Sequence, residues 1–177
     1  MIPTANGCVA EMSYDVRIER SGIHAIIDLQ GEPERIAAWA GDALPEFPQR
    51  PNTASCRGDI CLFWIAAERW LLHAALDLEA ELLALAPPQS APVDVSAVLV
   101  SDTLTFFRIE GRDAEQIVAI ASPLDVHASV FGDNAVSYTE AFGLKALLRR
   151  IPGGFEIAVE SSFADMLGDY LGRATAC

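Results

Sequence analysis

HAIIDLQGEPERIAAWA at residues 24–40 and LTFFRIEGRDAEQIVAIA at residues 104–121 share one pattern. Each begins with an apolar run typical of a buried strand and reaches a glycine, Gly31 or Gly111. Each continues with apolar residues at helical spacing, which are Ile36 and Ala37 in the first stretch and Ile117 and Val118 in the second. A strand, a glycine turn and a helix in the same order indicate a structural unit that occurs twice.

The flanking sequence predicts similar elements around each copy. In the first half we expect a strand at Val16–Ile18, a turn at Ser21-Gly22, a strand at Ile23–Leu29 and a helix ending near Gly41. Three prolines make Leu44–Ser55 a loop. Further predictions are strands at Ile60–Ala66 and Arg69–Ala74 and a helix at Leu76–Ala86, which has apolar residues on two faces and is stopped by Pro87-Pro88.

The second half repeats this order. We expect strands at Val93–Val100 and Leu104–Glu110, a helix ending before Pro123, and strands at Ala135–Glu140, Leu144–Ile151 and Phe155–Glu160. A two-residue hairpin loop at Pro152-Gly153 would place Arg149 opposite Glu156, Lys145 opposite Glu160, Leu148 opposite Ile157 and Ala146 opposite Val159.

The last helix is expected to begin with a capping box formed by Ser162 and Asp165. Phe163, Leu167, Tyr170 and Leu171 follow at helical spacing and should dock on a sheet. The prediction is an α+β fold with mixed or antiparallel sheets and pseudo-duplicated ββα units. It comprises a flexible arm at 1–15 and one domain at 16–177, with pseudo-repeats at about 16–88 and 92–173.

Composition excludes several classes of protein. The 177 residues are 51% hydrophobic and carry a formal net charge of −13. Intrinsic disorder requires low hydrophobicity, and nucleic-acid binding requires clustered basic residues, whereas this chain has 12 basic against 25 acidic residues. Because no apolar run is long enough to span a bilayer and the start does not resemble an export signal, we expect a cytoplasmic protein that binds neither nucleic acid nor membrane.

Few residues suggest chemistry by themselves. No glycine-rich phosphate loop or nucleophile elbow is present. Without an export signal, the four cysteines (Cys8, Cys56, Cys61, Cys177) are interpreted as reduced thiols, and a zinc site at Cys56 and Cys61 is the weaker alternative because further ligands are missing. His24, in a strand, and His73, at a strand end, are interpreted as structural, and His127 lies in the loop after Pro123.

Two segments resemble the gamma subunit of heterotetrameric sarcosine oxidase. They are Ser122-Pro123-Leu124-Asp125-Val126-His127 and the stretch 154–167, which contains Ser162-Phe163-Ala164-Asp165. The order of upstream segments also fits, so the resemblance covers about residues 16–171. Ser122, Ser161 and Met166 stand where the family has Cys, Arg and Tyr, which leaves related dehydrogenases of N-methylglutamate or dimethylglycine open. Residues 100–125 also look like aminomethyltransferase domains, whose folate-binding fold is related.

The resemblance implies a complex of alpha, beta, gamma and delta subunits that oxidatively demethylates sarcosine and passes the methyl carbon to tetrahydrofolate. FAD, FMN, NAD and tetrahydrofolate would lie on the larger chains and zinc on delta. No cofactor and no active site are implied for this chain, whose role would be assembly.

Nine residues are therefore candidates for family motifs or subunit contacts rather than catalysis. They are Trp64, Trp70, Leu82, Pro123, Asp125, His127, Ser162, Phe163 and Asp165. Tryptophans that look exposed and a helix apolar on two faces are features of an obligate interface. His127 has either an interface hydrogen-bonding role or a local one. The alternatives are a free-standing folate-dependent aminomethyltransferase-like enzyme, which should be roughly twice this length, and a small-molecule binding module.

Overall fold

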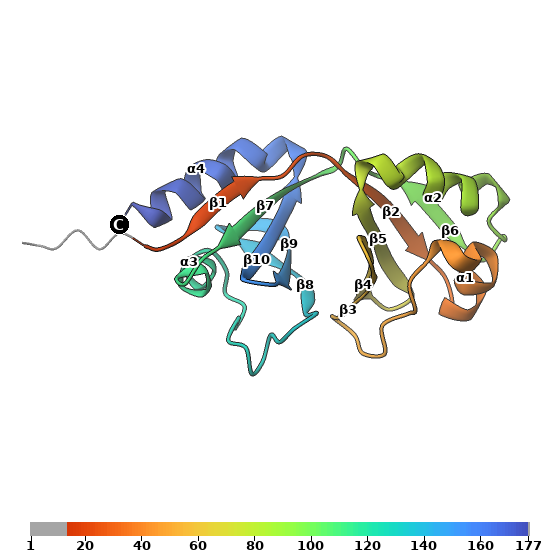
Figure 1. The fold of residues 1–177 in the computed structure, drawn as a ribbon, viewed down its shortest axis with the longest axis horizontal. Coiled ribbons are helices and arrows are strands. Elements are labelled where there is room, and N and C mark those ends of the chain that lie inside the picture. Colours follow the sequence, from red (N-terminus) through yellow and green to blue (C-terminus); the bar gives the residue numbers. More distant parts are fainter. Residues whose placement is uncertain (1–13, 177) are drawn as a thin grey trace, which may run out of the picture.

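The computed structural model describes residues 14–176 and contains two antiparallel five-stranded sheets, each covered by helices on its outer face (Figure 1). Sheet A has the order β1-β7-β10-β9-β8, and sheet B has the order β3-β4-β5-β2-β6. The predicted α+β class with duplicated ββα units is confirmed. Most of the predicted arm at 1–15 lies outside the described residues.

The elements of the first half are, in chain order, β1 Arg17–Arg20, β2 His24–Gln30, α1 Pro33–Ala40, β3 Ala54–Arg57, β4 Ile60–Ala66, β5 Arg69–Ala75 and α2 Glu79–Leu85. Those of the second half are β6 Ser96–Leu99, β7 Leu104–Glu110, α3 Ala114–Ala121, β8 Val136–Ala141, β9 Leu144–Ile151, β10 Gly154–Glu160 and α4 Ala164–Thr175. Short 3₁₀ turns precede α2 and α4.

Each half gives its first strand to the sheet of the other half. β1 pairs with β7 in sheet A, and β6 pairs with β2 in sheet B. The crossovers match as well, because Ser21 N–H donates to the Phe106 carbonyl (2.9 Å) and Val100 N–H donates to the Ile26 carbonyl (2.8 Å). Figure 1 shows β1 running directly into β2 and so joining the two sheets. The halves are therefore locked together by reciprocal strand exchange.

Gly31 and Gly111 make this exchange possible. They follow β2 and β7 at φ values of 135° and 129°, which are unfavourable for residues with a side chain. A Cβ on Gly31 would lie 2.8 Å from the Asp94 carbonyl oxygen, and one on Gly111 would come closer still to the Asp15 carbonyl oxygen. Asp94 and Asp15 lie just before the exchanged strands, so each glycine leaves room for the strand arriving from the other half.

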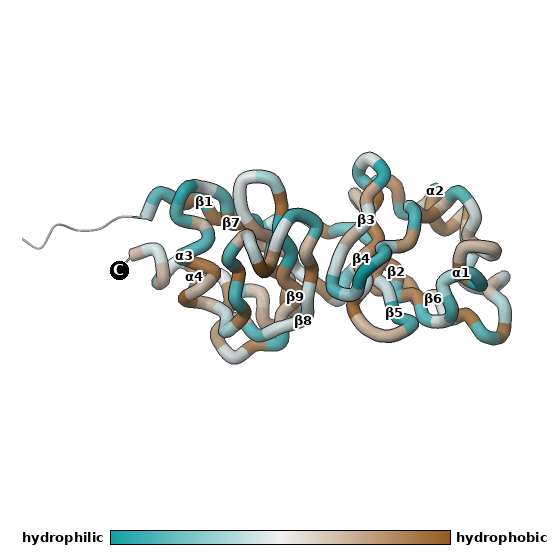
Figure 2. The backbone as a smooth tube through the Cα atoms, turned by 90° about the horizontal axis from the view of Figure 1, so that it is seen from below, coloured by the Kyte–Doolittle hydropathy of each residue, from teal (hydrophilic) through white to brown (hydrophobic). Residues whose placement is uncertain are grey.

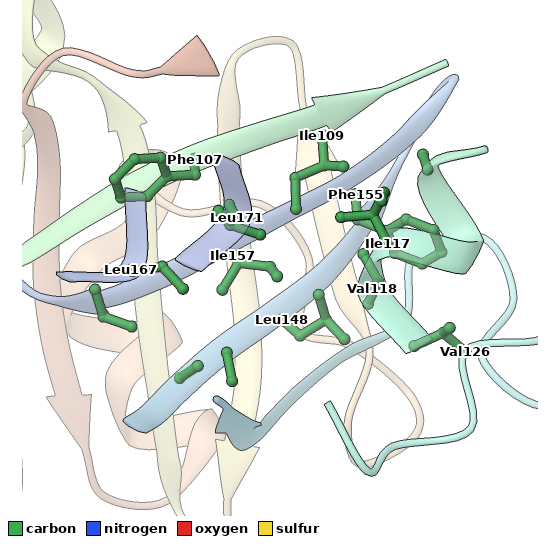
Figure 3. Close-up of a cluster of buried hydrophobic side chains, with 14 of the residues drawn as sticks. Phe107, Ile109, Ile117, Val118, Val126, Leu148, Phe155, Ile157, Leu167 and Leu171 are labelled. Carbon is green, nitrogen blue, oxygen red and sulfur yellow. The ribbon is translucent and has the colours of Figure 1, made fainter. Parts of the chain in front are cut away.

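Three hydrophobic clusters match this layered arrangement. The outer face of sheet A packs on α3 and α4, where side chains such as Ile109, Leu148 and Ile157 meet Ile117 and Leu167 (Figure 3). The outer face of sheet B packs on α1 and α2. A smaller cluster lies between the two sheets and contains Ile26, Cys61, Phe63, Leu71, Phe106, Val136, Leu147 and Ala158. Figure 2 shows the strands and helices of sheet A beside those of sheet B, with hydrophobic segments in both.

The hairpin of β9 and β10 has the predicted register. Arg149 lies opposite Glu156, Leu148 opposite Ile157, and Ala146 opposite Val159. Because successive side chains alternate between faces, Leu148 and Ile157 join the outer cluster, while Arg149 and Glu156 face sheet B.

Two local predictions were wrong. The predicted loop at 44–55 ends in the edge strand β3, which is held by pairing with β4, a contact that local propensity does not reveal. The capping box at Ser162 and Asp165 is absent, because a 3₁₀ turn at Ser161–Phe163 delays the start of α4 and no side chain caps it. Asp165 instead pairs with Arg20 of β1 at 2.8 Å.

We expect Gly111→Ala to lower the free energy of unfolding by about 2 kcal/mol or more, because the new Cβ meets the backbone of Asp15 at a positive φ. Gly172→Ala in α4 is the matched control, since nothing lies within 4 Å of its added Cβ. Urea denaturation measures both. Equal stability of the two variants would contradict the proposed role of Gly111.

Candidate functional site

The two sheets do not close on each other along their whole length. At the end near the crossover from β1 to β2 they leave a cleft of about 770 Å³, which we call the histidine cleft. Sheet B lines it with Cys56, Cys61, His73 and His24, and sheet A lines it with Arg108, Glu156 and Arg149. A volume of this size suits a small-molecule ligand.

The strand registers explain how these residues meet. Cys56 lies opposite Cys61, Cys61 opposite His73, and His73 opposite Ile26, so one row of side chains crosses β3, β4, β5 and β2. Across the cleft, Glu156 of β10 lies opposite both Arg108 and Arg149. Glu19 of β1 also lines the cleft, so residues from four strands of sheet B and four strands of sheet A converge on one end of the sheet interface.

His73 is the most unusual residue of the cleft. It is only 5% exposed, its ring stacks on Phe63 and lies tilted against Phe106, and neither ring nitrogen has a hydrogen-bond partner. Its ring centroid is 4.6 Å from that of His24, whose Nδ1 is also buried without a partner. Buried polar atoms normally have partners, because an unsatisfied one costs about 1–3 kcal/mol.

Burial holds both imidazoles in the neutral form. Desolvation lowers the pKa of His73 well below its ordinary value, and nearby Arg149 and His24 lower it further. Desolvation also lowers the pKa of His24, against the opposing effect of Glu156. At neutral pH each ring therefore has one N–H donor and one acceptor nitrogen.

A buried ion pair forms the opposite wall. Arg149 Nε donates to Glu156 Oε2 at 2.6 Å, and the Glu156 side chain is 3% exposed. The Arg149 guanidinium also lies 5.2 Å from the Phe63 ring centroid. The Arg149 charge acts on both histidines, since it lowers the pKa of each.

The structure contradicts the interpretation of Cys56 and Cys61 as free thiols, because their sulfur atoms form a disulfide. No strand was predicted at Cys56, whereas β3 brings it opposite Cys61. Among residues 14–176, no cluster of three or more His, Cys, Asp or Glu residues is arranged to hold a metal ion. Cys8 and Cys177 lie outside the described residues.

A second cleft, of about 490 Å³, opens at the other end of the sheet interface, near the crossover from β6 to β7. Its lining includes the Asp28–Arg69 ion pair (2.5 Å), Tyr138 and Ser162. Burial raises the pKa of Tyr138. Ser162 is thus the one C-terminal motif residue among our candidates that reaches a cleft.

The predicted contact residues divide into buried and exposed ones. Trp70 and Leu82 are each 2% exposed and lie in the cluster beneath α1 and α2, so the expectation that Trp70 is exposed was wrong. Trp64 is only partly buried and lies near Trp70. Phe163 was expected to dock on a sheet but is 42% exposed. One face of α2 is covered, while Leu85 on the same helix is 53% exposed.

The signature segment after α3 forms an exposed, ordered loop. Asp125 Oδ1 accepts a hydrogen bond from the His127 backbone N–H at 3.0 Å, and His127 Nδ1 lies 2.7 Å from Ser129 Oγ. Pro123, Asp125 and His127 are all exposed. None of these three side chains lines the histidine cleft, but Arg150, which does, donates to the Val126 carbonyl in the same segment.

Sequence reasoning did not find the histidine cleft. His24 and His73 were interpreted separately as structural, because 49 positions apart they form no motif. The available signal was the polar residue His73 inside an otherwise apolar strand, together with the Arg149–Glu156 pairing. The sequence does not show which residues of sheet B lie near Arg149 and Glu156, because that depends on how one sheet packs on the other.

We expect His73→Phe to weaken the pH dependence of stability. The unfolded chain binds protons on His73 below pH 6.5 while the folded chain does not, so wild-type stability falls as pH drops from 6.5 toward the lowered folded pKa. The loss approaches about 1.4 kcal/mol per pH unit for one such group. Denaturation of both proteins across this range measures it, and an unchanged slope in the variant would contradict the assignment.

We expect Glu156→Gln to cost about 3 kcal/mol, because it leaves the Arg149 charge buried without its partner. Replacing both, with Arg149→Met and Glu156→Leu, should cost less than the single change. The exposed pair Arg17–Glu19 is the control, and Glu19→Gln should change stability by less than about 1 kcal/mol. A double variant less stable than Glu156→Gln would overturn this account of the pair.

Comparison with solved structures gives two informative matches. A chain of the heterotetrameric sarcosine oxidase from Corynebacterium sp. U-96, solved in complex with pyrrole 2-carboxylate, superposes with a TM-score of 0.78 at 20% identity, over 90% of this chain and 83% of that one. The glycine cleavage system aminomethyltransferase T from Bartonella henselae gives a TM-score of 0.61 at 16% identity, over 90% of this chain and 46% of that one.

The two superpositions establish a shared fold, and the identities are too low to show more than that. The resemblance found in the sequence is therefore confirmed for the fold. The chain spans just under half of the aminomethyltransferase. No protein-family model matches the chain, and no curated protein matches it. No helix within residues 14–176 is both long and apolar enough to cross a membrane.

Proposed function

We propose that this chain is a non-catalytic, gamma-type subunit of a sarcosine oxidase-like complex. The observation that supports this most strongly is the fold likeness to a chain of heterotetrameric sarcosine oxidase, which extends over most of both chains. The signature residues Pro123, Asp125 and His127 add support, because they lie in an exposed and internally hydrogen-bonded loop.

The reaction assigned to the complex is the oxidative demethylation of sarcosine, or of a related N-methyl amino acid, with transfer of the methyl carbon to tetrahydrofolate. In this proposal the chain acts by assembly. FAD, FMN, NAD, tetrahydrofolate and zinc belong to the alpha, beta and delta subunits, and no residue of this chain is assigned to them. We also place the complex in the cytoplasm.

We propose a contact surface beside the residues that the sequence indicated. Leu82 and Trp70 are buried in the chain's own core. Leu76, in the 3₁₀ turn before α2, and Leu85, at the end of α2, are 45% and 53% exposed. Exposed leucines on a helix are suited to burial against a second protein, since the centres of subunit interfaces are apolar. We assign them to contact with a larger subunit.

Co-expression with the alpha, beta and delta chains of a sarcosine oxidase-like complex tests this function. We expect the tagged chain to recover all three partners in a fixed ratio, and the complex lacking it to lose assembly and sarcosine-dependent electron transfer. Recovery of the chain alone, with full activity in its absence, would contradict the proposal.

Two variants map the surface within the same experiment. Leu85→Glu should reduce recovery of the partners at least tenfold, because it places a charge in an apolar contact. Ile120→Glu on α3 is the control, since Ile120 is 51% exposed but lies in the other half of the chain. Loss of partners with Ile120→Glu but not with Leu85→Glu would move the contact to the other half.

The alternative is a folate-dependent aminomethyltransferase-like or folate-binding protein that acts alone. The aminomethyltransferase T likeness favours it, although the chain spans 46% of that enzyme. Titration of the purified chain with tetrahydrofolate in a calorimeter distinguishes the two functions. Binding by the lone chain favours the alternative, whereas heat only from dilution favours the subunit.

A further inference from the structure

The Cys56–Cys61 disulfide is expected to add less stability than a cross-link that closes a long loop. It joins residues five positions apart, and the stabilisation from a cross-link falls as the enclosed loop becomes shorter. The two strands are already paired on both sides of it, with Ser55 opposite Leu62 and Arg57 opposite Ile60. Arg57 also donates to the Leu44 and Asp42 carbonyls, which hold β3 independently of the sulfur atoms.

The disulfide is nevertheless accessible from the histidine cleft. Cys56 is exposed, Cys61 is 8% exposed, and both line the cleft. Its 770 Å³ is enough for a peptide-sized small molecule to reach the sulfur of Cys56. Attack on a disulfide depends on such access.

The same cleft has polar groups that lack partners. His73 is 5% exposed and lies opposite Cys61 in the pairing of β4 with β5. Neither of its ring nitrogens has a hydrogen-bond partner. Nδ1 of His24 is a third such atom. A visiting molecule with its own donors and acceptors would satisfy these atoms beside the disulfide, whereas a purely apolar one would not.

We propose that Cys56–Cys61 is a thiol–disulfide exchange site for low-molecular-weight thiols that carry polar groups and enter the histidine cleft. Such reversible bonds are the kind that occur in reducing compartments, where structural disulfides are rare. The site is independent of the subunit function proposed above, because it uses residues of this chain alone.

The exchange is balanced in two steps. The thiolate of the first thiol attacks Sγ of Cys56, the protein S–S bond breaks, and its electron pair leaves on Sγ of Cys61, which takes up the proton released by that thiol. The thiolate of a second small thiol then attacks the small-molecule sulfur of the mixed disulfide. The bond to Cys56 breaks, its electron pair leaves on Sγ of Cys56, and that sulfur takes up the proton released by the second thiol, so the oxidised, symmetrical disulfide is released. Two small thiols are oxidised, and the protein disulfide is reduced by two electrons.

The experiment uses the full chain with Cys8→Ser and Cys177→Ser, so that Cys56 and Cys61 are the only reactive cysteines. After incubation in mixtures of reduced and oxidised glutathione, the sample is alkylated and intact mass is measured. We expect a transient glutathione adduct, complete reduction at millimolar glutathione with an unchanged circular dichroism spectrum, and reoxidation by oxidised glutathione. The proposal would be overturned if millimolar glutathione reduced the Cys56–Cys61 disulfide only after the protein unfolds. It would also be overturned if Cys56 and Cys61 stayed reduced in oxidised glutathione.

A variant tests whether the cleft takes part. His73→Phe keeps a ring between Phe63 and Phe106 but removes both nitrogens. We expect it to slow exchange with glutathione severalfold while leaving exchange with ethanethiol, which has no polar group besides its thiol, nearly unchanged. His127→Phe, at an exposed histidine outside the cleft, should change neither rate. Equal effects of His73→Phe on both reagents would contradict recognition by the cleft.

Discussion

Reciprocal strand exchange is the constraint on which the rest of this structure depends. Because β1 completes sheet A and β6 completes sheet B, neither half can form its whole sheet without the other. The exchange requires two close backbone approaches, and both occur at a glycine, Gly31 and Gly111. The same two positions mark the end of the strand in each copy of the repeated sequence pattern.

The clefts also follow from this arrangement. The crossovers tie the sheets together at β1–β2 and β6–β7, and an isolated bridge between Thr53 and Ala135 ties the edges beside β3 and β8. The apolar cluster fills the middle of the interface, and polar side chains lie towards its ends. His73, Glu156 and Arg149 are thus buried by the packing of two sheets, which explains neutral imidazoles and a desolvated ion pair in a chain whose surface is strongly acidic.

Much of the fold was predictable from sequence because the signals were local. Helical spacing and turn residues located the main helices, and the short Pro152-Gly153 loop fixed the register that puts Arg149 opposite Glu156. The errors arose where contacts between residues far apart in the sequence determine the local structure. β3 exists because β4 pairs with it, Trp70 is covered by packing beneath α1 and α2, and Asp165 pairs with Arg20 instead of capping α4. His24, His73 and Cys61 come together only when β2, β5 and β4 pair in register, so no local sequence motif predicts the site.

Cooperative unfolding of the two halves is the most direct test of strand exchange. All three tryptophans, Trp39, Trp64 and Trp70, lie in the first half, so fluorescence reports on that half. Amide hydrogen exchange of β9 and β10 reports on the other. The account predicts one transition in urea, with the same midpoint and slope for both probes. Separate midpoints, with β9 and β10 still protected after the tryptophans are exposed to water, would contradict it.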